Sequence, residues 1–133
     1  MYKRLTHVGI AVKRLENSSK LFSKLLNTNH EHTEEVAEQK VRVSFFRIGD
    51  GGIELLEPTS ADSPIARFIE KRGEGVHHLS FEVDDLEAEI ARLKREGFQM
   101  IDETPRAGAD GYRVAFLHPK STNGVLVEIS QKM

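Results

Sequence analysis

The sequence predicts an α+β domain built from two tandem β-α-β-β-β modules. The 133 residues contain 38% hydrophobic and 30% charged side chains, which suits one folded domain with its own core. The chain also repeats itself at an offset of 71 residues, so that HVGIAV from His7 aligns with HLSFEV from His78. Within each half, a helical pattern is flanked by short alternating apolar runs, which is the pattern of one helix among strands.

Each module is expected to begin with a strand and a helix. The strands start at His7 and at His78, and the helices are marked by apolar residues at helical spacing. These residues are Leu21, Phe22, Leu25 and Leu26 in the first module and Leu86, Ile90 and Leu93 in the second. The runs KVRVSFFRIG and GIELLEP, and then YRVAFLHP and GVLVEIS, predict the remaining strands.

The whole chain, residues 1–133, is therefore interpreted as one domain. Module one covers about 4–58, a linker helix about 62–73, and module two about 75–131. The offset between the halves is far too long for a solenoid repeat, so a duplicated half-domain explains it better.

Charge and hydropathy narrow the class of protein. The net charge is −2 with both signs mixed along the chain, which argues against a dedicated nucleic-acid surface. No run is long and apolar enough for a membrane span or a signal peptide, and there is no cysteine. We expect a cytoplasmic protein without a nucleic-acid or membrane partner.

Two histidines stand next to each other in the second module, and strand geometry distinguishes them. Side chains alternate between the two faces of a strand, so His77 and His78 should point in opposite directions. His7 shares its face with Gly9 and Ala11, and His78 shares its face with Ser80, so both faces leave room for a ligand. The repeat also pairs His78 with His7, which predicts that His78 belongs to a site and that His77 does not.

Glu54 and Glu128 occupy equivalent places in the repeat, and each is a lone carboxylate in an apolar strand. Burying an unpaired carboxylate is costly, so each needs a cation or a hydrogen-bonding partner. Together with His7 and His78 they predict a site for a divalent metal, because imidazole and carboxylate ligands suit such ions.

Other histidines carry less information. His30 and His32 lie in the polar stretch NTNHEHTEE and are interpreted as solvated loop residues. His118 precedes Pro119 near the Glu128 strand, where it could contact a ligand or a substrate.

Four segments, HVGIAV, IELLEP, GEGVHHLSFEVDDL and PRAGADGYRVAFLHPKSTNGVLVEI, resemble the vicinal oxygen chelate superfamily, which groups glyoxalases, bleomycin resistance proteins and dioxygenases. Within it the chain is most similar to the methylmalonyl-CoA epimerases. The resemblance covers essentially the whole chain. It implies a curved, barrel-like mixed sheet around a metal site.

The resemblance also implies a ligand set of His7, Glu54, His78 and Glu128. One divalent metal ion per chain is expected: zinc or cobalt first, with nickel, manganese or magnesium as further options. The implied enzyme is an isomerase that interconverts the stereoisomers of methylmalonyl-CoA, by removing the α-proton through a metal-stabilised enolate. Glu128 is then the first candidate for the base, and Glu54 for a second acid/base.

The implied partners are an acyl-CoA substrate and a second copy of the chain in a homodimer. Lys120 and Ser121, in the loop HPKSTNG, and the neighbouring His118 are the candidate substrate contacts.

Two positions depart from some epimerases, and they keep alternatives open. Some members carry glutamine at the position of Glu54, and some carry a glutamate that acts as second acid/base where this chain has Val43. A carboxylate at position 54 also resembles the glyoxalase I type of lactoylglutathione lyase. A non-enzymatic binding module of the antibiotic-resistance type is a further alternative, although such modules typically lack the four ligands. An extradiol dioxygenase fits less well, because its iron uses two histidines and one carboxylate.

Overall fold

The computed structural model describes residues 1–133, and its elements follow the predicted order twice. The strands are β1 (Tyr2–Ala11), β2 (His32–Val36), β3 (Val41–Ile48), β4 (Gly51–Pro58), β5 (Gly75–Val83), β6 (Arg106–Ala107), β7 (Tyr112–Leu117) and β8 (Val127–Lys132). The α-helices are α1 (Leu15–Leu26), α2 (Pro64–Arg72) and α3 (Leu86–Arg95). Three short 3-10 helices complete the chain: η1 (Ala37–Gln39), η2 (Ala109–Gly111) and η3 (Pro119–Thr122).

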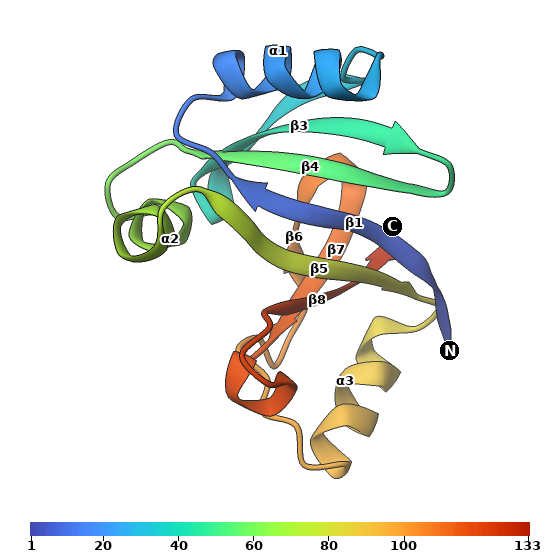
Figure 1. Ribbon diagram of the computed structural model, residues 1–133. Helices are drawn as coiled ribbons and strands as arrows, with labels where there is room; N and C mark the ends of the chain where they lie inside the picture. Colours follow the sequence, from blue (N-terminus) through green and yellow to red (C-terminus); the bar gives the residue numbers. More distant parts are fainter.

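All eight strands form one mixed sheet in the order β2-β3-β4-β1-β5-β8-β7-β6 (Figure 1). The order is symmetrical about its centre, where the first strands of the two modules, β1 and β5, pair in antiparallel fashion. On either side, β4 runs parallel to β1 and β8 runs parallel to β5. The α+β class with two β-α-β-β-β units in a curved mixed sheet is confirmed.

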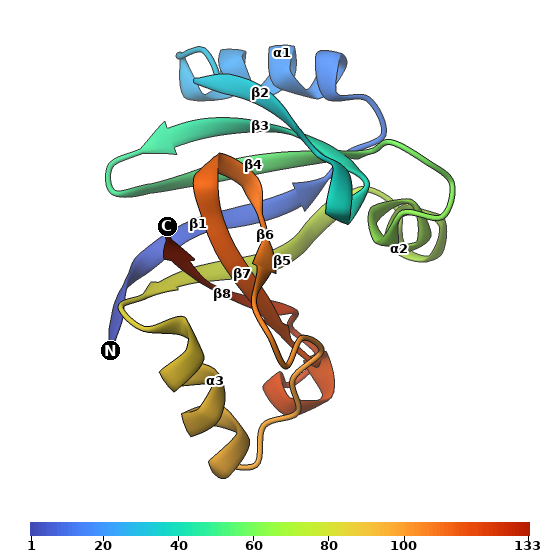
Figure 2. The ribbon, with the colours of Figure 1, turned by 180° about the vertical axis from the view of Figure 1, so that it is seen from behind.

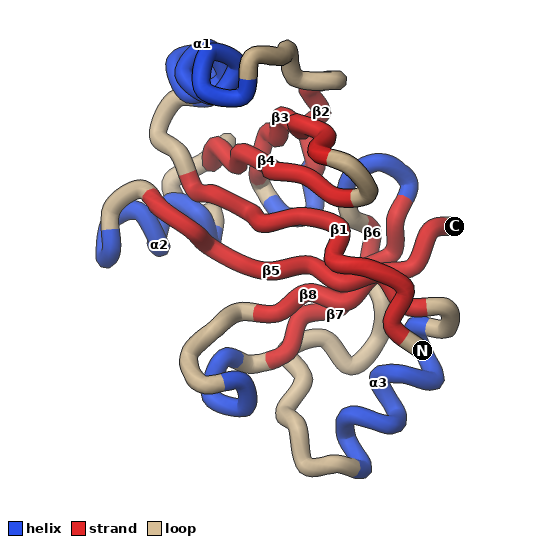
Figure 3. The backbone as a smooth tube through the Cα atoms, turned by 45° about the vertical axis from the view of Figure 1, so that its right-hand side comes forward, coloured by secondary structure: helices blue, strands red, loops and turns tan.

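The sheet curves until its two ends approach each other (Figures 2 and 3). The backbone N–H of Asp110, in η2, donates to Glu34 in β2 at 2.9 Å. The Gln39 side chain donates to the carbonyl oxygen of Ala107, in β6, at 3.5 Å. These contacts join the edges of the two modules, so the concave face becomes the wall of a cavity.

The helices cover the outside of the curve, as expected for a sheet with one face on a core. Helix α1 lies beside β3 and β4, and α3 lies beside β7 and β8 (Figure 1). No helix in the structure combines the length and the apolar character that crossing a membrane would require.

The predicted apolar stripe of α1 is only half right. Phe22 and Leu26 pack against the cluster of Val12, Leu15, Phe46 and Leu55, whereas Leu21 and Leu25 are 62% and 70% exposed. Residues one apart on a helix lie about 100° apart, so one member of each adjacent apolar pair must turn away from the core. The buried face is continued by Ser19, whose hydroxyl donates to the hydroxyl of Ser44 in β3.

Candidate active site

His7 and His78 meet at the centre of the sheet, because the antiparallel pairing of β1 and β5 places them close to one another. Their Nε2 atoms are 3.0 Å apart and their rings lie at 83° to each other. His78 is only 3% exposed, which makes it one of the most enclosed polar residues of the chain. The two nitrogens therefore face a common point on the concave side.

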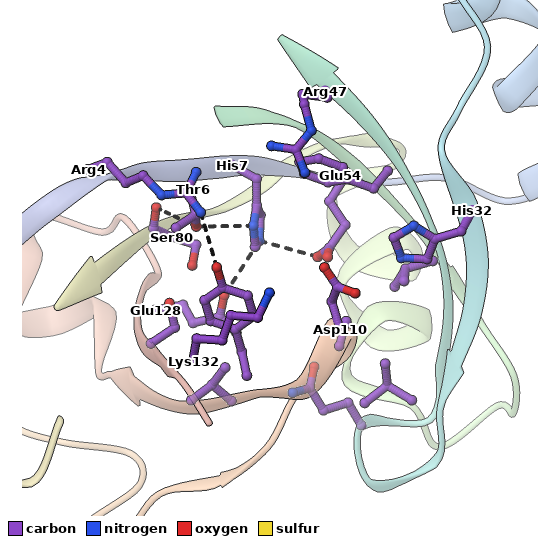
Figure 4. A pocket seen from close by; sticks show the side chains of 18 residues that line it. Arg4, Thr6, His7, His32, Arg47, Glu54, Ser80, Asp110, Glu128 and Lys132 are labelled. Carbon is purple, nitrogen blue, oxygen red and sulfur yellow. Dashed lines mark hydrogen bonds and ion pairs between the residues drawn. The ribbon is translucent and has the colours of Figure 1, made fainter. Parts of the chain in front are cut away.

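Two carboxylates flank the histidine pair. The Oε1 atom of Glu54 lies 3.3 Å from the Nε2 atom of His7 and 3.9 Å from that of His78. The corresponding distances from the Oε1 atom of Glu128 are 3.5 and 3.8 Å. Figure 4 shows Glu54 and Glu128 on opposite sides of the His7 ring. The structure thus brings together all four residues that the repeat singles out.

Strand register explains the arrangement. Gly9 pairs with Glu54 on one side and with His78 on the other, while Ser80 pairs with His7 and with Glu128. Each row across the sheet therefore carries a carboxylate, a small residue and a histidine. The two rows are related by the same approximate symmetry that relates the modules.

Gly9 must be small for the site to exist. A Cβ atom at this position would lie 2.2 Å from Cε1 and 2.5 Å from Nδ1 of His78. The expectation that small residues accompany the histidines on their face is therefore confirmed at Gly9 by direct contact.

The donor set suits a divalent metal. His7, Glu54 and His78 each offer one ligand atom, and these three atoms all lie within 4.8 Å of one another. Metal–ligand bonds of about 2.0–2.2 Å place neighbouring donors roughly 3–3.5 Å apart, close to the observed separations. Neutral imidazole nitrogens and carboxylate oxygens fit zinc, cobalt, nickel or manganese.

Burial dominates the electrostatics of the metal-free site. Burial raises the pKa of Glu54 to about 8, and the nearby Glu128 charge adds to the shift. Burial likewise raises the pKa of Glu128 to about 7. For the histidines burial has the opposite effect: it lowers the pKa of His7 to about 4 and that of His78 well below its usual value. Near neutral pH the imidazoles are therefore neutral, as metal ligands must be, and both carboxyl groups titrate.

These shifts predict that the metal-free chain loses stability above about pH 6.5. A carboxyl whose pKa is raised on folding stabilises the protein at low pH; that contribution declines as pH rises above the ordinary carboxyl pKa of 4.5 and is gone once pH has passed about 7 for Glu128 and about 8 for Glu54. The histidines, whose pKa values are lowered from 6.5 on folding, add stability as pH rises to about 6.5 and offset the carboxyl loss below that pH, so that the net decline begins above it. The midpoint of thermal unfolding should fall between about pH 6.5 and pH 8.5, and a divalent metal should reverse the fall.

A Glu54→Gln, Glu128→Gln double variant is the control for this experiment, since it has no carboxyl to ionise at either position. Its metal-free unfolding temperature should be flat over the same pH range. An equal alkaline decline in the double variant would assign the effect to other groups.

The site opens into a cavity of about 310 Å³ on the concave face (Figure 4). His7, Glu54 and Glu128 line it, while His78 lines a neighbouring cavity of about 190 Å³ behind the pair. Charged and aromatic side chains complete the main cavity, namely Arg4, His32, Phe45, Arg47, Asp110, Tyr112 and Lys132. Three of these are basic, but Arg4 is paired with Glu82 at 2.9 Å and Arg47 with Glu31 at 2.8 Å, which leaves Lys132 as the basic group without a carboxylate partner.

Several of these lining residues were missed in the sequence. Ser130 and Lys132 follow Glu128 at intervals of two on β8, and Phe45 and Arg47 follow Val43 in the same way on β3, so strand alternation could have identified them. Asp110 comes from η2, where no periodic signal exists. The interpretation of His32 as a solvated loop residue is wrong: it begins β2 and lines the cavity. His30 also packs its ring against Phe46, with centroids 5.9 Å apart.

Val43 faces the cavity with 2% exposure. Its cross-strand neighbour on β2 is Glu34, which does not line the cavity and accepts a hydrogen bond from Asp110 instead. An aliphatic side chain cannot transfer a proton, so at this position the chain has no acid/base.

The prediction that the side chains of His77 and His78 point to opposite faces of the strand is wrong, whereas the prediction that His78 is the one beside His7 agrees with the structure. The pairing of β1 with β5 shifts between Gly9–His78 and Ile10–Val76, which leaves His77 in a β-bulge without a partner. The bulge turns His77 towards its neighbour, and the two Nδ1 atoms lie 3.0 Å apart. His77 also packs edge-on against Phe68 of α2. It is His78, not His77, whose Nε2 atom faces His7.

The candidate substrate contacts lie apart from the cavity. Lys120 and Ser121 lie in η3 and His118 directly precedes it, and none of the three lines either cavity. His118 Nδ1 accepts from the backbone N–H of Lys120, and the Ser121 hydroxyl oxygen accepts from the backbone N–H of Gln99. The His118 side chain thus stabilises its own loop, and the Ser121 side chain joins that loop to the segment that follows α3.

Known proteins with similar sequences indicate the family of this chain. The sequence profile of the Glyoxalase/Bleomycin resistance protein/Dioxygenase superfamily matches residues 6–116. The uncharacterized protein YqjC of Bacillus subtilis is 43% identical, with 96% of this chain and 91% of YqjC covered. The mitochondrial methylmalonyl-CoA epimerase of Homo sapiens is 40% identical over 96% of this chain and 73% of its own length.

A solved structure agrees with these sequence relatives. A single-residue variant of Streptomyces coelicolor methylmalonyl-CoA epimerase, in complex with 2-nitronate-propionyl-CoA, superposes with a TM-score of 0.96 at 35% identity. The alignment covers 99% of this chain and 96% of the other. The chain belongs to the Glyoxalase/Bleomycin resistance protein/Dioxygenase superfamily, and methylmalonyl-CoA epimerases are among its close relatives.

Proposed function

We propose that this protein is a metal-dependent epimerase that interconverts the stereoisomers of methylmalonyl-CoA. The chain is an isomerase similar to the methylmalonyl-CoA epimerases. One observation carries the specific proposal: two buried carboxylates, Glu54 and Glu128, lie on opposite sides of the His7 ring and line one cavity with it. Inverting a carbon centre requires a proton to leave one face and another to arrive at the opposite face.

His7, Glu54, His78 and Glu128 would hold the metal. When bound, a divalent ion supplies a positive charge that polarises a carbonyl oxygen and stabilises the negative charge that develops when the α-proton leaves. Each carboxylate has two oxygens, so an oxygen that faces the histidines leaves the other for the substrate.

Glu128 and Glu54 would then carry the proton. In one direction, ionised Glu128 removes the α-proton while protonated Glu54 gives a proton to the opposite face, and the two groups exchange protonation states. The reverse reaction uses the same groups in exchanged roles.

The cavity fits the acyl end of an anionic thioester. At about 310 Å³ it is smaller than a coenzyme A molecule, so the nucleotide part of the substrate would extend outside. Lys132 lines the cavity without a carboxylate partner and would supply positive charge for a carboxylate or phosphate, while Arg4 and Arg47 are paired with Glu82 and Glu31. His118, Lys120 and Ser121 remain proposed contacts for the part of the substrate outside the cavity. The proposed enzyme consists of one domain of two modules, and it acts as a homodimer.

A direct assay starts from one stereoisomer of methylmalonyl-CoA and follows the appearance of the other. We expect inversion by the metal-loaded protein, and a loss of about 10²-fold or more after the metal is removed, recovered when Co²⁺ or Zn²⁺ is added back. The same preparations are offered the hemithioacetal of glutathione and methylglyoxal. Conversion of that adduct without inversion of methylmalonyl-CoA would assign the chain to the glyoxalase I type instead.

A further inference from the structure

In each of the two metal-site histidines, the ring nitrogen that does not face the other histidine meets a second protein group. Nδ1 of His78 lies 3.0 Å from Nδ1 of His77, and Nδ1 of His7 lies 3.3 Å from the hydroxyl oxygen of Thr6. Neither Thr6 nor His77 has a role in the proposed reaction, since neither is a ligand or a proton carrier. Their contacts are nevertheless made at the one atom of each ligand that decides its tautomer.

The chemistry of imidazole makes these contacts decisive. A neutral imidazole has one N–H and one nitrogen with a free lone pair. The Nε2 atoms of His7 and His78 can both bind a metal only if each ring carries its hydrogen on Nδ1. The opposite tautomer would direct an N–H at the ion. A partner that accepts a hydrogen bond from Nδ1–H therefore favours the form that binds metal.

Thr6 is arranged as such an acceptor. Its hydroxyl donates to the carbonyl oxygen of Ser80 at 3.1 Å, which commits its only hydrogen. The oxygen is then left to accept from the Nδ1–H of His7. Thr6 is 7% exposed, so water does not readily replace this contact.

His77 reaches the same position through the bulge in β5. The unpaired residue turns its ring beside His78, and Phe68 holds the ring from the other side with a centroid distance of 4.9 Å and an interplanar angle of 84°. Bulges are frequent next to active sites, where they re-aim a side chain. With its own hydrogen on Nε2, His77 accepts at Nδ1 the hydrogen bond from the Nδ1–H of His78, 3.0 Å away.

We propose that Thr6 and His77 are positioning residues that hold His7 and His78 in the Nδ1–H tautomer, so that both Nε2 lone pairs point to a metal ion. The inference rests on the proposed metal centre, and it adds that metal affinity depends on two residues that never touch the ion. Removing partners of this kind typically lowers metal affinity by about 10–100-fold.

Crossed substitutions at His77 separate the hydrogen bond from packing. His77→Phe keeps a ring against Phe68 but has no acceptor, whereas His77→Asn loses the ring but places a carbonyl oxygen near the position of Nδ1. We expect the Co²⁺ dissociation constant of His77→Phe to rise by about 10–100-fold and that of His77→Asn to stay within a few-fold of wild type. Thr6→Val and Thr6→Ser should behave as the corresponding pair. Thermal unfolding of each metal-free variant reports folding separately.

The outcome that overturns the proposal is specific. His77→Phe with wild-type affinity, or His77→Asn as weak as His77→Phe, would show that the ring packs and does not position. A second measurement needs no variant: ¹⁵N chemical shifts of the histidines in the Zn²⁺-loaded protein should show His78 with its hydrogen on Nδ1. A hydrogen on Nε2 would contradict the proposal.

These measurements contain no substrate, so they do not depend on the reaction. Weakened Co²⁺ binding in His77→Phe together with absent epimerase activity would refute the proposed reaction and support the positioning role. A wild-type chain that binds no Co²⁺, Zn²⁺, Ni²⁺ or Mn²⁺ would overturn both the metal centre and this proposal.

Discussion

Glu54→Gln should retain its metal and lose epimerisation by a factor on the order of 10² or more, the scale of a lost general acid/base. Glutamine keeps an oxygen that can face His7 and His78, 3.3 and 3.9 Å away from the glutamate oxygen in the wild type. It cannot gain or lose a proton at neutral pH. The loss therefore separates proton transfer from coordination, which the position of Glu54 alone does not do.

Glu34→Gln is a matched control for this variant. It makes the same chemical change on β2, outside the cavity. The charge of Glu34 contributes to the raised pKa of Glu54, although Glu34 does not line the cavity. We expect its turnover to stay within a few-fold of wild type. Near-normal turnover by metal-loaded Glu54→Gln would assign Glu54 to coordination alone, and the second proton would then have to come from elsewhere in the cavity.

Gly9→Ala should disrupt the site without replacing any of its functional groups. The added Cβ would lie 2.2 Å from the His78 ring, far inside van der Waals contact, so the ring must move. Overpacking of this kind costs roughly 1–3 kcal/mol of stability. Displacing a reacting geometry by about 1 Å can cost about 10²-fold in rate. We expect Co²⁺ affinity and epimerisation to fall together, measured by metal titration and by the isomer assay.

The Gly9→Ala, His78→Ala double variant tests the cause. If the methyl group acts through the His78 ring, then adding Gly9→Ala to a His78→Ala background should cost little further stability. Its unfolding temperature should match that of His78→Ala. Equal and additive losses in the two backgrounds would show that the methyl group disturbs the β1 backbone itself.

Much of the fold could be predicted from the sequence because the two modules repeat the same pattern. The match of HVGIAV with HLSFEV defines β1 and β5, and the matching strands that follow define a symmetrical sheet. Glu54 and Glu128 stand out because burying a charge in an apolar strand needs a reason. These signals are periodic and local, which is why one sequence suffices for them.

The remaining features depend on contacts between distant segments. The bulge at His77 breaks the period of two, and no residue in HHLSF signals it, because it arises in the pairing with β1. Asp110 enters the cavity because the curvature of the sheet brings η2 against β2. On α1, adjacent leucine and phenylalanine residues satisfy two possible faces equally well, and only packing against Phe46 and Leu55 decides between them.

Solvent deuterium at the α-carbon tests most directly whether two opposed carboxylates carry the proton. A single isomer of methylmalonyl-CoA is incubated with metal-loaded protein in D₂O, next to a protein-free control. Two groups on opposite faces predict that the first molecules of inverted product carry deuterium while the remaining substrate keeps its hydrogen. Glu54→Gln should then exchange the hydrogen of one isomer with solvent without inverting it. Product that retains the original hydrogen, or a Glu54→Gln protein that inverts the centre at the wild-type rate, would contradict the two-carboxylate mechanism.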